Sequence, residues 1–109
     1  MKRTNITENG ERNGKWFDAE NAGLFKEDSW HDGQNWISYA TSSQWGHESI
    51  YVTKAGVFIL NHWSNFQGTH ETYEIISKAK AAEWFVRNNY KDEEIPAQFQ
   101  ESIANLEVK

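Results

Sequence analysis

The stretch "ESIYVTKAGVFILNHW", Glu48 to Trp63, carries the strongest structural signal in this sequence. Two runs rich in β-branched and aromatic residues, which favour strands, flank the three residues "KAG". Gly56 suits the left-handed position of a three-residue hairpin loop. We therefore predict an antiparallel hairpin. Because both of its faces carry apolar side chains, we place it in the centre of a sheet.

The loop also predicts how the two strands pair. Counting outward from it sets Ile50 opposite Leu60 and Glu48 opposite His62. A carboxylate directly across from an imidazole is typical of a charge-assisted hydrogen bond. We therefore predict a close contact between Glu48 and His62 on one face of the hairpin.

Further strands and one short helix are predicted around this hairpin. The segment 36–41, "WISYAT", alternates its side chains in the way that favours a strand, and so does the segment 71–77, "ETYEIIS". Upstream, Asp18 can cap a short helix in which Ala22 and Phe25 lie three residues apart.

The C-terminal third predicts two more helices. Ser77 can cap a helix over 78–89, "KAKAAEWFVRNN", and Pro96 fits the first turn of a last helix. The elements together indicate an α+β fold. We expect a small antiparallel sheet of three to four strands, with a short N-terminal helix and two C-terminal helices packed on one face.

Length and local composition predict the domain organisation. The chain has 109 residues, enough for one domain. Residues 1–14 are polar, and Ile6 is their one apolar residue beyond Met1. Such a segment cannot offset its own ordering entropy by burial. We expect a disordered polar tail over 1–14 and a single α+β domain over 15–109.

Overall composition excludes several classes of protein. There is no cysteine, which removes disulfides, thiolate metal sites and thiol catalysis. The net charge of −5 has the wrong sign for a chain that neutralises phosphates, so nucleic acid is disfavoured as a partner. Because the sequence lacks the apolar core of a signal peptide and any apolar run of bilayer length, we expect a cytoplasmic protein without a membrane segment.

Three segments carry a resemblance to a known family: "KWFDAENA" (15–22), "NWISYATSSQWGHESIYVTKAGVFILNHWS" (35–64) and "ISKAKAAEWFVRNN" (76–89). In its Ser-Gln-Trp turn, Thr-x-x-Gly hairpin and Ala-Ala-x-Trp helix, the chain resembles a family of small uncharacterised bacterial proteins, many of them carried on mobile elements. The resemblance implies a phage-borne or plasmid-borne accessory gene. It assigns no catalytic residue.

A repeated motif suggests one kind of chemistry. "SQWGHES", 43–49, returns in stretched form as "SNFQGTHET", 64–72, and each copy contains a His-Glu pair. Imidazole and carboxylate groups bind zinc and non-haem iron, so His47, His62 and His70 are candidate ligands of a small metal-dependent hydrolase. However, adjacent residues of a strand point to opposite faces, so a His-Glu pair does not easily reach one ion. We therefore predict no metal and no cofactor.

The surplus of tryptophan suggests a binding surface. Six tryptophans are too many for a core of this size, so some should be exposed, where tryptophan is typical of binding hot spots. Trp45 and Phe66 lie in the two glycine-containing turns, and Trp63 precedes the second. The alternative is that these rings fold back onto the core. The amide side chains beside them would supply hydrogen bonds: Gln44, Asn65 and Gln67.

The sequence thus favours a non-enzymatic accessory protein that binds another macromolecule, in the form of a phage-borne or plasmid-borne modulator of a host protein. One alternative is a module that binds a glycan or small molecule with the same aromatic and amide side chains. The metal-dependent hydrolase is a further alternative. The identity of the partner and the choice between monomer and homodimer stay open.

Overall fold

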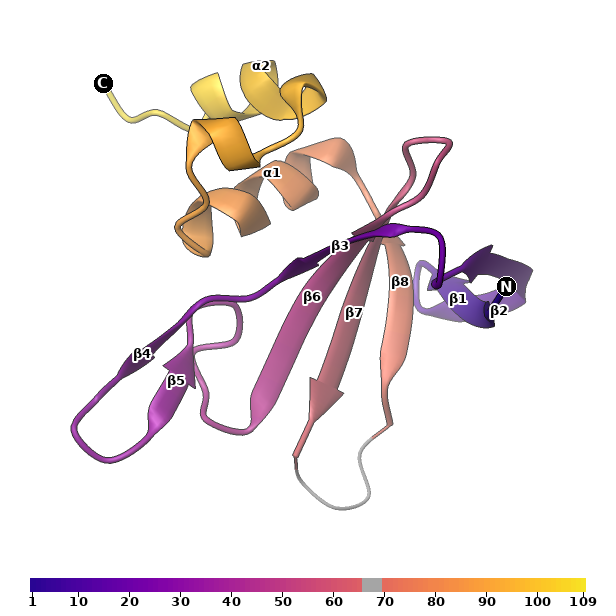
Figure 1. Ribbon diagram of the computed structural model, residues 1–109, viewed down its shortest axis with the longest axis horizontal. Helices are drawn as coiled ribbons and strands as arrows, with labels where there is room; N and C mark the ends of the chain where they lie inside the picture. The colour runs from indigo at the N-terminus through magenta and orange to yellow at the C-terminus, as the bar shows by residue number, and fades with distance from the viewer. Residues whose placement is uncertain (66–69) are drawn as a thin grey trace.

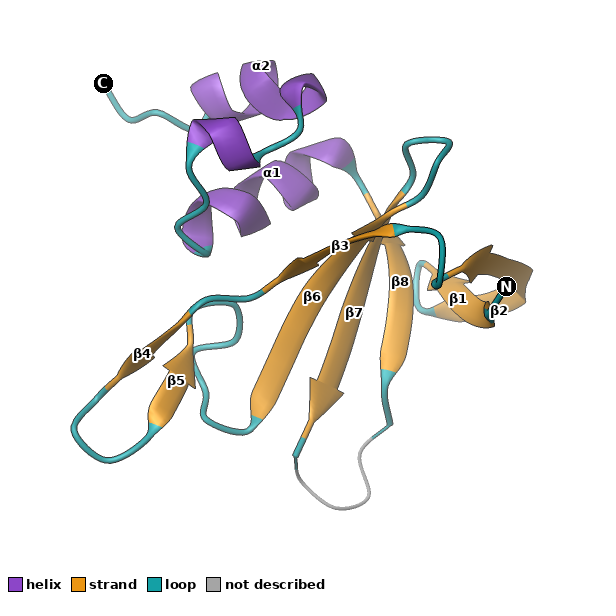
Figure 2. Ribbon diagram, in the orientation of Figure 1, coloured by secondary structure: helices purple, strands orange, loops and turns teal. Residues whose placement is uncertain are grey.

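A six-stranded sheet with helices on one face forms the body of the protein (Figures 1 and 2). The computed structural model describes residues 1–65 and 70–109. The strand order in the main sheet is β2-β1-β8-β7-β6-β3, and β4 pairs with β5 in a second, two-stranded sheet. The strands are β1 (Arg3–Glu8), β2 (Glu11–Asp18), β3 (Gly23–Lys26), β4 (Ser29–His31), β5 (Trp36–Ser38), β6 (Gly46–Val52), β7 (Phe58–Ser64) and β8 (Thr72–Ile76). The helices are α1 (Lys78–Arg87) and α2 (Gln100–Ala104), with 3-10 turns η1 (Asp92–Glu94) and η2 (Ala97–Phe99) between them.

The predicted fold class, a small antiparallel sheet with three helices, is wrong. The main sheet is larger and mixed, because β1 lies parallel to β8 while the other pairs are antiparallel. Two α-helices are present among the described residues, and both follow the sheet in sequence. The extra strands come from the N-terminal third of the chain, where a tail and a helix were expected.

The polar N-terminal segment forms a hairpin instead of a disordered tail. Asn9 and Gly10 both adopt positive φ, 54° and 81°, as a tight two-residue hairpin turn requires. The strands contribute little apolar surface of their own, but Ile6 and Phe17 are buried against Ile59 of the central hairpin. The segment is therefore ordered by apolar surface that the rest of the sheet provides.

The helix predicted from Asp18 is absent, and the chain forms β3 there. Asp18 ends β2, and its carboxylate accepts hydrogen bonds from the backbone N–H groups of Lys2 and Glu20. The following residues alternate like a strand: Leu24 is exposed, while Phe25 packs edge-on against a core phenylalanine of α1 at 5.0 Å between ring centroids. Pairing with β6 therefore overrides a weak helical pattern.

The central hairpin is confirmed in detail. Ile50 pairs with Leu60 and Glu48 with His62, and Gly56 takes a φ of 83° in the loop. The strand predicted over 71–77 is confirmed as β8. The strand predicted over 36–41 is shorter, ends at Ser38, and lies in the two-stranded sheet.

The first C-terminal helix is also confirmed. The Ser77 hydroxyl accepts a hydrogen bond from the backbone N–H of Lys80 at 3.2 Å, and Asn89 adopts a left-handed φ of 61° after the helix. The predicted last helix is short and starts as a 3-10 turn directly after Pro96. Its Phe99 is fully buried.

The two faces of the sheet carry different cores. The helix face packs Ile50 and Phe58 against α1 residues such as Phe85. The opposite face is covered at one end by the β1–β2 hairpin, around Ile6 and Phe17. In Figure 1, the β4–β5 hairpin extends away from the main sheet at the far side from β1 and β2. No helix in the described part of the chain is long and apolar enough to cross a membrane.

We expect Phe85→Ala to lower the free energy of unfolding by about 3–5 kcal/mol, because it would leave a cavity among fully buried rings. Its neighbour Val86 is 46% exposed on the same helix, so Val86→Ala should cost about 0.5 kcal/mol or less. Urea unfolding followed by tryptophan fluorescence measures both. Equal losses for the two variants would contradict the position of α1 on the sheet.

Candidate functional site

Four residues meet where β6 begins and β7 ends: Trp45, His47, Trp63 and Asn65. The His47 ring stacks on Trp63, with centroids 5.7 Å apart and planes 28° apart. Nε2 of His47 lies 3.0 Å from the side-chain amide nitrogen of Asn65, and the backbone N–H of Asn65 donates to the carbonyl of Trp45 at 3.0 Å. Three of the residues predicted to bind a partner, Trp45, Trp63 and Asn65, therefore meet around His47.

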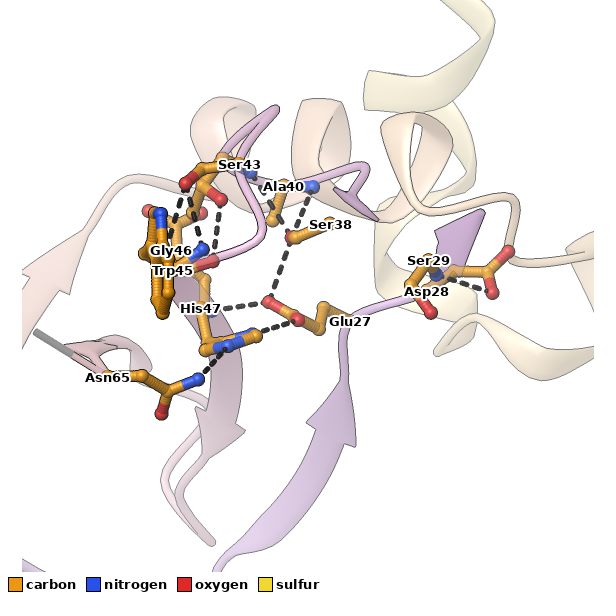
Figure 3. A network of polar contacts seen from close by, with 12 residues as sticks. Glu27, Asp28, Ser29, Ser38, Ala40, Ser43, Trp45, Gly46, His47 and Asn65 are labelled. Atoms are coloured by element: carbon orange, nitrogen blue, oxygen red, sulfur yellow. Dashed lines mark hydrogen bonds and ion pairs between the residues drawn. The ribbon is translucent and has the colours of Figure 1, made fainter. Parts of the chain in front are cut away.

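The carboxylate of Glu27 holds this end of the protein together (Figure 3). One oxygen lies 2.7 Å from Nδ1 of His47. The other accepts hydrogen bonds from the Ser38 hydroxyl at 2.9 Å and from the backbone N–H of Glu48 at 2.6 Å. The Glu27 side chain is only 14% exposed, so these three donors replace most of its water.

The contacts of His47 determine what it can do chemically. Nδ1 faces the Glu27 carboxylate and Nε2 faces the Asn65 side-chain amide, so both ring nitrogens have polar partners. A carboxylate and an imidazole in this order resemble an acid-base pair, yet Nε2 meets an amide where a nucleophile would present a hydroxyl or thiol. The arrangement therefore positions the ring and the residues stacked on it.

The turn before β6 presents Trp45. The Ser43 hydroxyl accepts hydrogen bonds from the backbone N–H groups of Trp45 at 2.9 Å and Gly46 at 3.3 Å. The Thr41 hydroxyl donates to the Gly46 carbonyl at 2.7 Å, and a Cβ added at Gly46 would meet that hydroxyl at 3.3 Å. This close approach favours glycine. The turn holds the Trp45 side chain, 43% exposed, at the surface.

The remaining residues that were predicted to bind a partner or a metal ion lie in several places. Gln44 is half-buried in the Trp45 turn, while Phe66 and Gln67 lie outside the described residues. His62 is paired with Glu48, the residue that follows His47 in β6. Because successive residues of a strand point to opposite faces, the side chains of His47 and His62 lie on opposite sides of the sheet. His70 is exposed before β8. Within residues 1–65 and 70–109, no three His, Asp, Glu or Cys side chains are grouped in a way that would hold a metal ion.

The predicted hydrogen bond between Glu48 and His62 is not formed, although the two residues are paired. The Glu48 carboxylate instead accepts from the indole N–H of Trp84 at 3.2 Å. The sequence could not reveal this partner, because Trp84 lies 36 residues away on α1. Burial raises the pKa of Glu48, and the charge of His62 and the Trp84 hydrogen bond partly offset that effect.

The β4–β5 hairpin, which we call the arm (Ser29–Ser38), was only partly predicted. Its second strand lies within the predicted segment 36–41, but β4 is three residues long and too short to give a pattern. The arm exposes Trp36 by 64% and Trp30 by 42%. His31 packs edge-on against Trp36 at 5.2 Å, and Trp30 packs against Tyr39 at 6.4 Å.

The arm and the Trp45 turn belong to an acidic part of the chain. Residues 27–53 contain no lysine or arginine and four acidic residues: Glu27, Asp28, Asp32 and Glu48. At the tip of the arm, the Asp32 carboxylate accepts hydrogen bonds from the backbone N–H groups of Asn35 and Gln34. These bonds lower the pKa of Asp32, so a negative charge persists beside the exposed rings at neutral pH.

No protein-family model matches the chain, and neither a curated protein nor a solved structure gives a match.

We expect Glu27→Ala to destabilise the protein by about 3 kcal/mol. The substitution removes the hydrogen-bond partner of three largely buried groups, the Ser38 hydroxyl, the Glu48 backbone N–H and the His47 ring. Hydrogen exchange should rise at Ala40, whose N–H is bonded to the Ser38 hydroxyl. Glu101→Ala, at an exposed position of α2, should change the unfolding free energy by about 0.5 kcal/mol or less. Unchanged exchange at Ala40 would show that Glu27 does not fix the arm.

Glu48→Gln tests the buried carboxylate. Because burial raises the pKa of Glu48, its contribution to stability is greatest when it is protonated and is lost as the pH rises through that pKa. Glutamine keeps an acceptor for Trp84 and cannot ionise. We therefore expect the variant to gain stability relative to the wild type as the pH rises from about 4 to 7. Unfolding free energies measured across this range would contradict the assignment if the difference stayed constant or fell.

Proposed function

We propose that this protein is a non-enzymatic binding protein whose ligand is another protein. The contact surface is the aromatic end, defined as Trp30 and Trp36 of the arm together with Trp45 of the adjoining turn. One observation carries the proposal: a two-stranded arm extends from the sheet (Figure 1), and the indole rings of its two tryptophans are exposed.

The energetics of the arm support this role. An isolated two-stranded hairpin is marginally stable in water, so the arm depends on its attachment to the rest of the fold. That attachment is made at its base, where the backbone N–H of Tyr39 donates to the Asp28 carbonyl at 3.1 Å and Asn89 donates to the Asp28 carboxylate at 3.1 Å. The exposed rings of Trp30 and Trp36 can then contact a partner. Tryptophan is enriched among the residues that form binding hot spots.

The charge of the aromatic end indicates the partner's chemistry. Residues 27–53 carry only negative charge, and Asp32 stays ionised beside Trp36. Indole faces attract arginine and lysine side chains, and nearby carboxylates add to that attraction. The proposed partner therefore presents a basic protein surface.

The resemblance to small proteins of mobile elements supports a particular biological setting. In this proposal the chain is a phage-borne or plasmid-borne accessory protein that works in the cytoplasm and modulates a host protein. Its net charge of −5 favours a basic protein partner over nucleic acid.

A glycan or small polar molecule is the second candidate ligand, and a different surface favours it. Two hollows of about 310 and 350 Å³ lie on the sheet face opposite the helices, and both are lined by Asn61 and Trp63. Glu71 lines the first and Tyr51 the second. An aromatic ring beside an amide and a carboxylate suits a sugar ring, whose apolar face stacks while its hydroxyls form hydrogen bonds.

We expect Trp36→Ala to weaken binding to the protein partner by about 30-fold, which corresponds to the loss of about 2 kcal/mol at a hot spot. The partner is isolated with the wild-type chain as bait, purified, and titrated against each variant at two salt concentrations. Affinity should fall as salt rises, because the two surfaces carry opposite charge. Trp16→Ala is the matched control, since Trp16 is 44% exposed on β2 in the N-terminal hairpin.

Circular dichroism of Trp36→Ala should match that of the wild type, since the ring is exposed and outside both cores. Equal weakening by Trp16→Ala would remove the arm from the interface. Binding to immobilised glycans that is lost in Trp63→Ala, with no protein partner recovered, would favour the second candidate instead.

A further inference from the structure

A hollow of about 660 Å³ lies at the end of the sheet away from the arm. It forms where the N-terminal hairpin meets the loop between β6 and β7, so it combines elements from three separate parts of the chain. Its volume is within the range typical of small-molecule sites, whereas the hollows beside Trp63 are at the lower limit of that range. No residue of the aromatic end lines it.

The hollow has an apolar floor. Phe17 and Ile59, which are almost fully buried, support it from below, and Phe17 is itself fixed by edge contact with Tyr51 at 5.3 Å. A floor held in this way changes little when a ligand enters, so most of the apolar contact is gained without reorganisation. Besides Phe17 and Ile59, the apolar residues that line the hollow are Ile6, Trp16, Ala22, Ala55, Val57 and Ile75.

Two lysines line the same hollow. Lys15 comes from β2 and Lys54 from the β6–β7 loop, and both are exposed. Lys15 pairs with Glu8 at 3.5 Å, but the two side chains are 57% and 40% exposed, and an ion pair in water is weak enough to exchange for another anion. Both ammonium groups are therefore accessible to a negatively charged ligand.

Among the described residues that line the hollow, Asp18 supplies the one carboxylate, and its oxygens already accept hydrogen bonds. Asp18 accepts hydrogen bonds from two backbone N–H groups and from the side-chain amide of Asn21. These bonds lower its pKa and direct its oxygens to partners within the N-terminal region. Asp18 thus competes little for the two lysines.

We propose that this hollow binds a small anionic amphiphile, an aliphatic or aromatic carboxylate. Its apolar body lies on the floor around Ile59 and Phe17, and its carboxylate meets Lys15 and Lys54. The site shares no residue with the aromatic end, so it is independent of the proposed protein partner.

Isothermal titration with dodecanoate, below its micelle concentration, tests the proposal. We expect saturable binding at one site, and at least tenfold weaker binding to the double variant Lys15→Ala/Lys54→Ala, because both head-group contacts are lost. The matched control is Lys78→Ala/Lys109→Ala, which removes the same charge from two exposed lysines outside the hollow and should bind as the wild type does. Dodecyltrimethylammonium, with the same chain length and opposite charge, should bind at least tenfold more weakly than dodecanoate.

A variant that fills the hollow provides a second test. Ala55 lines it from an exposed position in the loop, so Ala55→Trp should block dodecanoate without removing a core side chain. Thermal unfolding checks that the variant is folded. Absence of dodecanoate binding to the wild type, equal binding of the cationic amphiphile, or equal loss in the two double lysine variants would each overturn the proposal. Trp36→Ala should bind dodecanoate normally, which separates this result from that of the protein partner.

Discussion

The register of β6 against β7 positions every other part of this molecule. It places Ile50 and Leu60 side by side on the helix face and Ser49 beside Asn61 on the other. A slip of one residue would exchange the two faces, exposing the side chains that α1 covers. Gly56 and the hydrogen bond from Thr53 to Val57 fix the loop, so the register is set locally before distant elements are added.

On this hairpin, one buried carboxylate connects the sheet to the arm. Glu27 accepts from Ser38 at the base of the arm and from the backbone of Glu48 in β6, while it holds His47 in place. A partly buried charge is tolerated because three donors satisfy it, and losing any of them would leave a costly unpaired group. The position of the two exposed tryptophans of the arm, Trp30 and Trp36, therefore follows from a polar network at the base of the arm.

The elements that the sequence predicts correctly are those whose signals are local. The loop at Gly56 and the cap at Ser77 each specify structure within a few residues. The N-terminal hairpin has a local signal too, at Asn9-Gly10, but its strands are polar and acquire an apolar partner, Ile59, only in the folded protein. Composition alone therefore indicates disorder where tertiary contacts produce order.

The residues of the candidate site likewise divide into those with a local sequence signal and those positioned by tertiary contacts. Trp45, Trp63 and Asn65 are predicted from turns and strand ends, and they do meet, but around a histidine whose orientation depends on Glu27, twenty residues upstream. No sequence pattern around Glu27 indicates that its carboxylate accepts several hydrogen bonds. The hollow that Lys54 lines cannot be predicted from the sequence either, because strands distant in sequence form its floor.

The two ends of the central hairpin therefore differ in chemistry for a structural reason. At the strand end, the hairpin meets the arm and an acidic stretch without lysine or arginine, and the aromatic rings face outward. At the loop end, it meets the N-terminal hairpin, which covers apolar side chains and brings Lys15 toward the hollow that Lys54 also lines. Because none of the tryptophans of the aromatic end lines the hollow, the two proposed ligands would not compete for any side chain. The same hairpin thus contributes to an acidic aromatic end and to a hollow lined by two lysines.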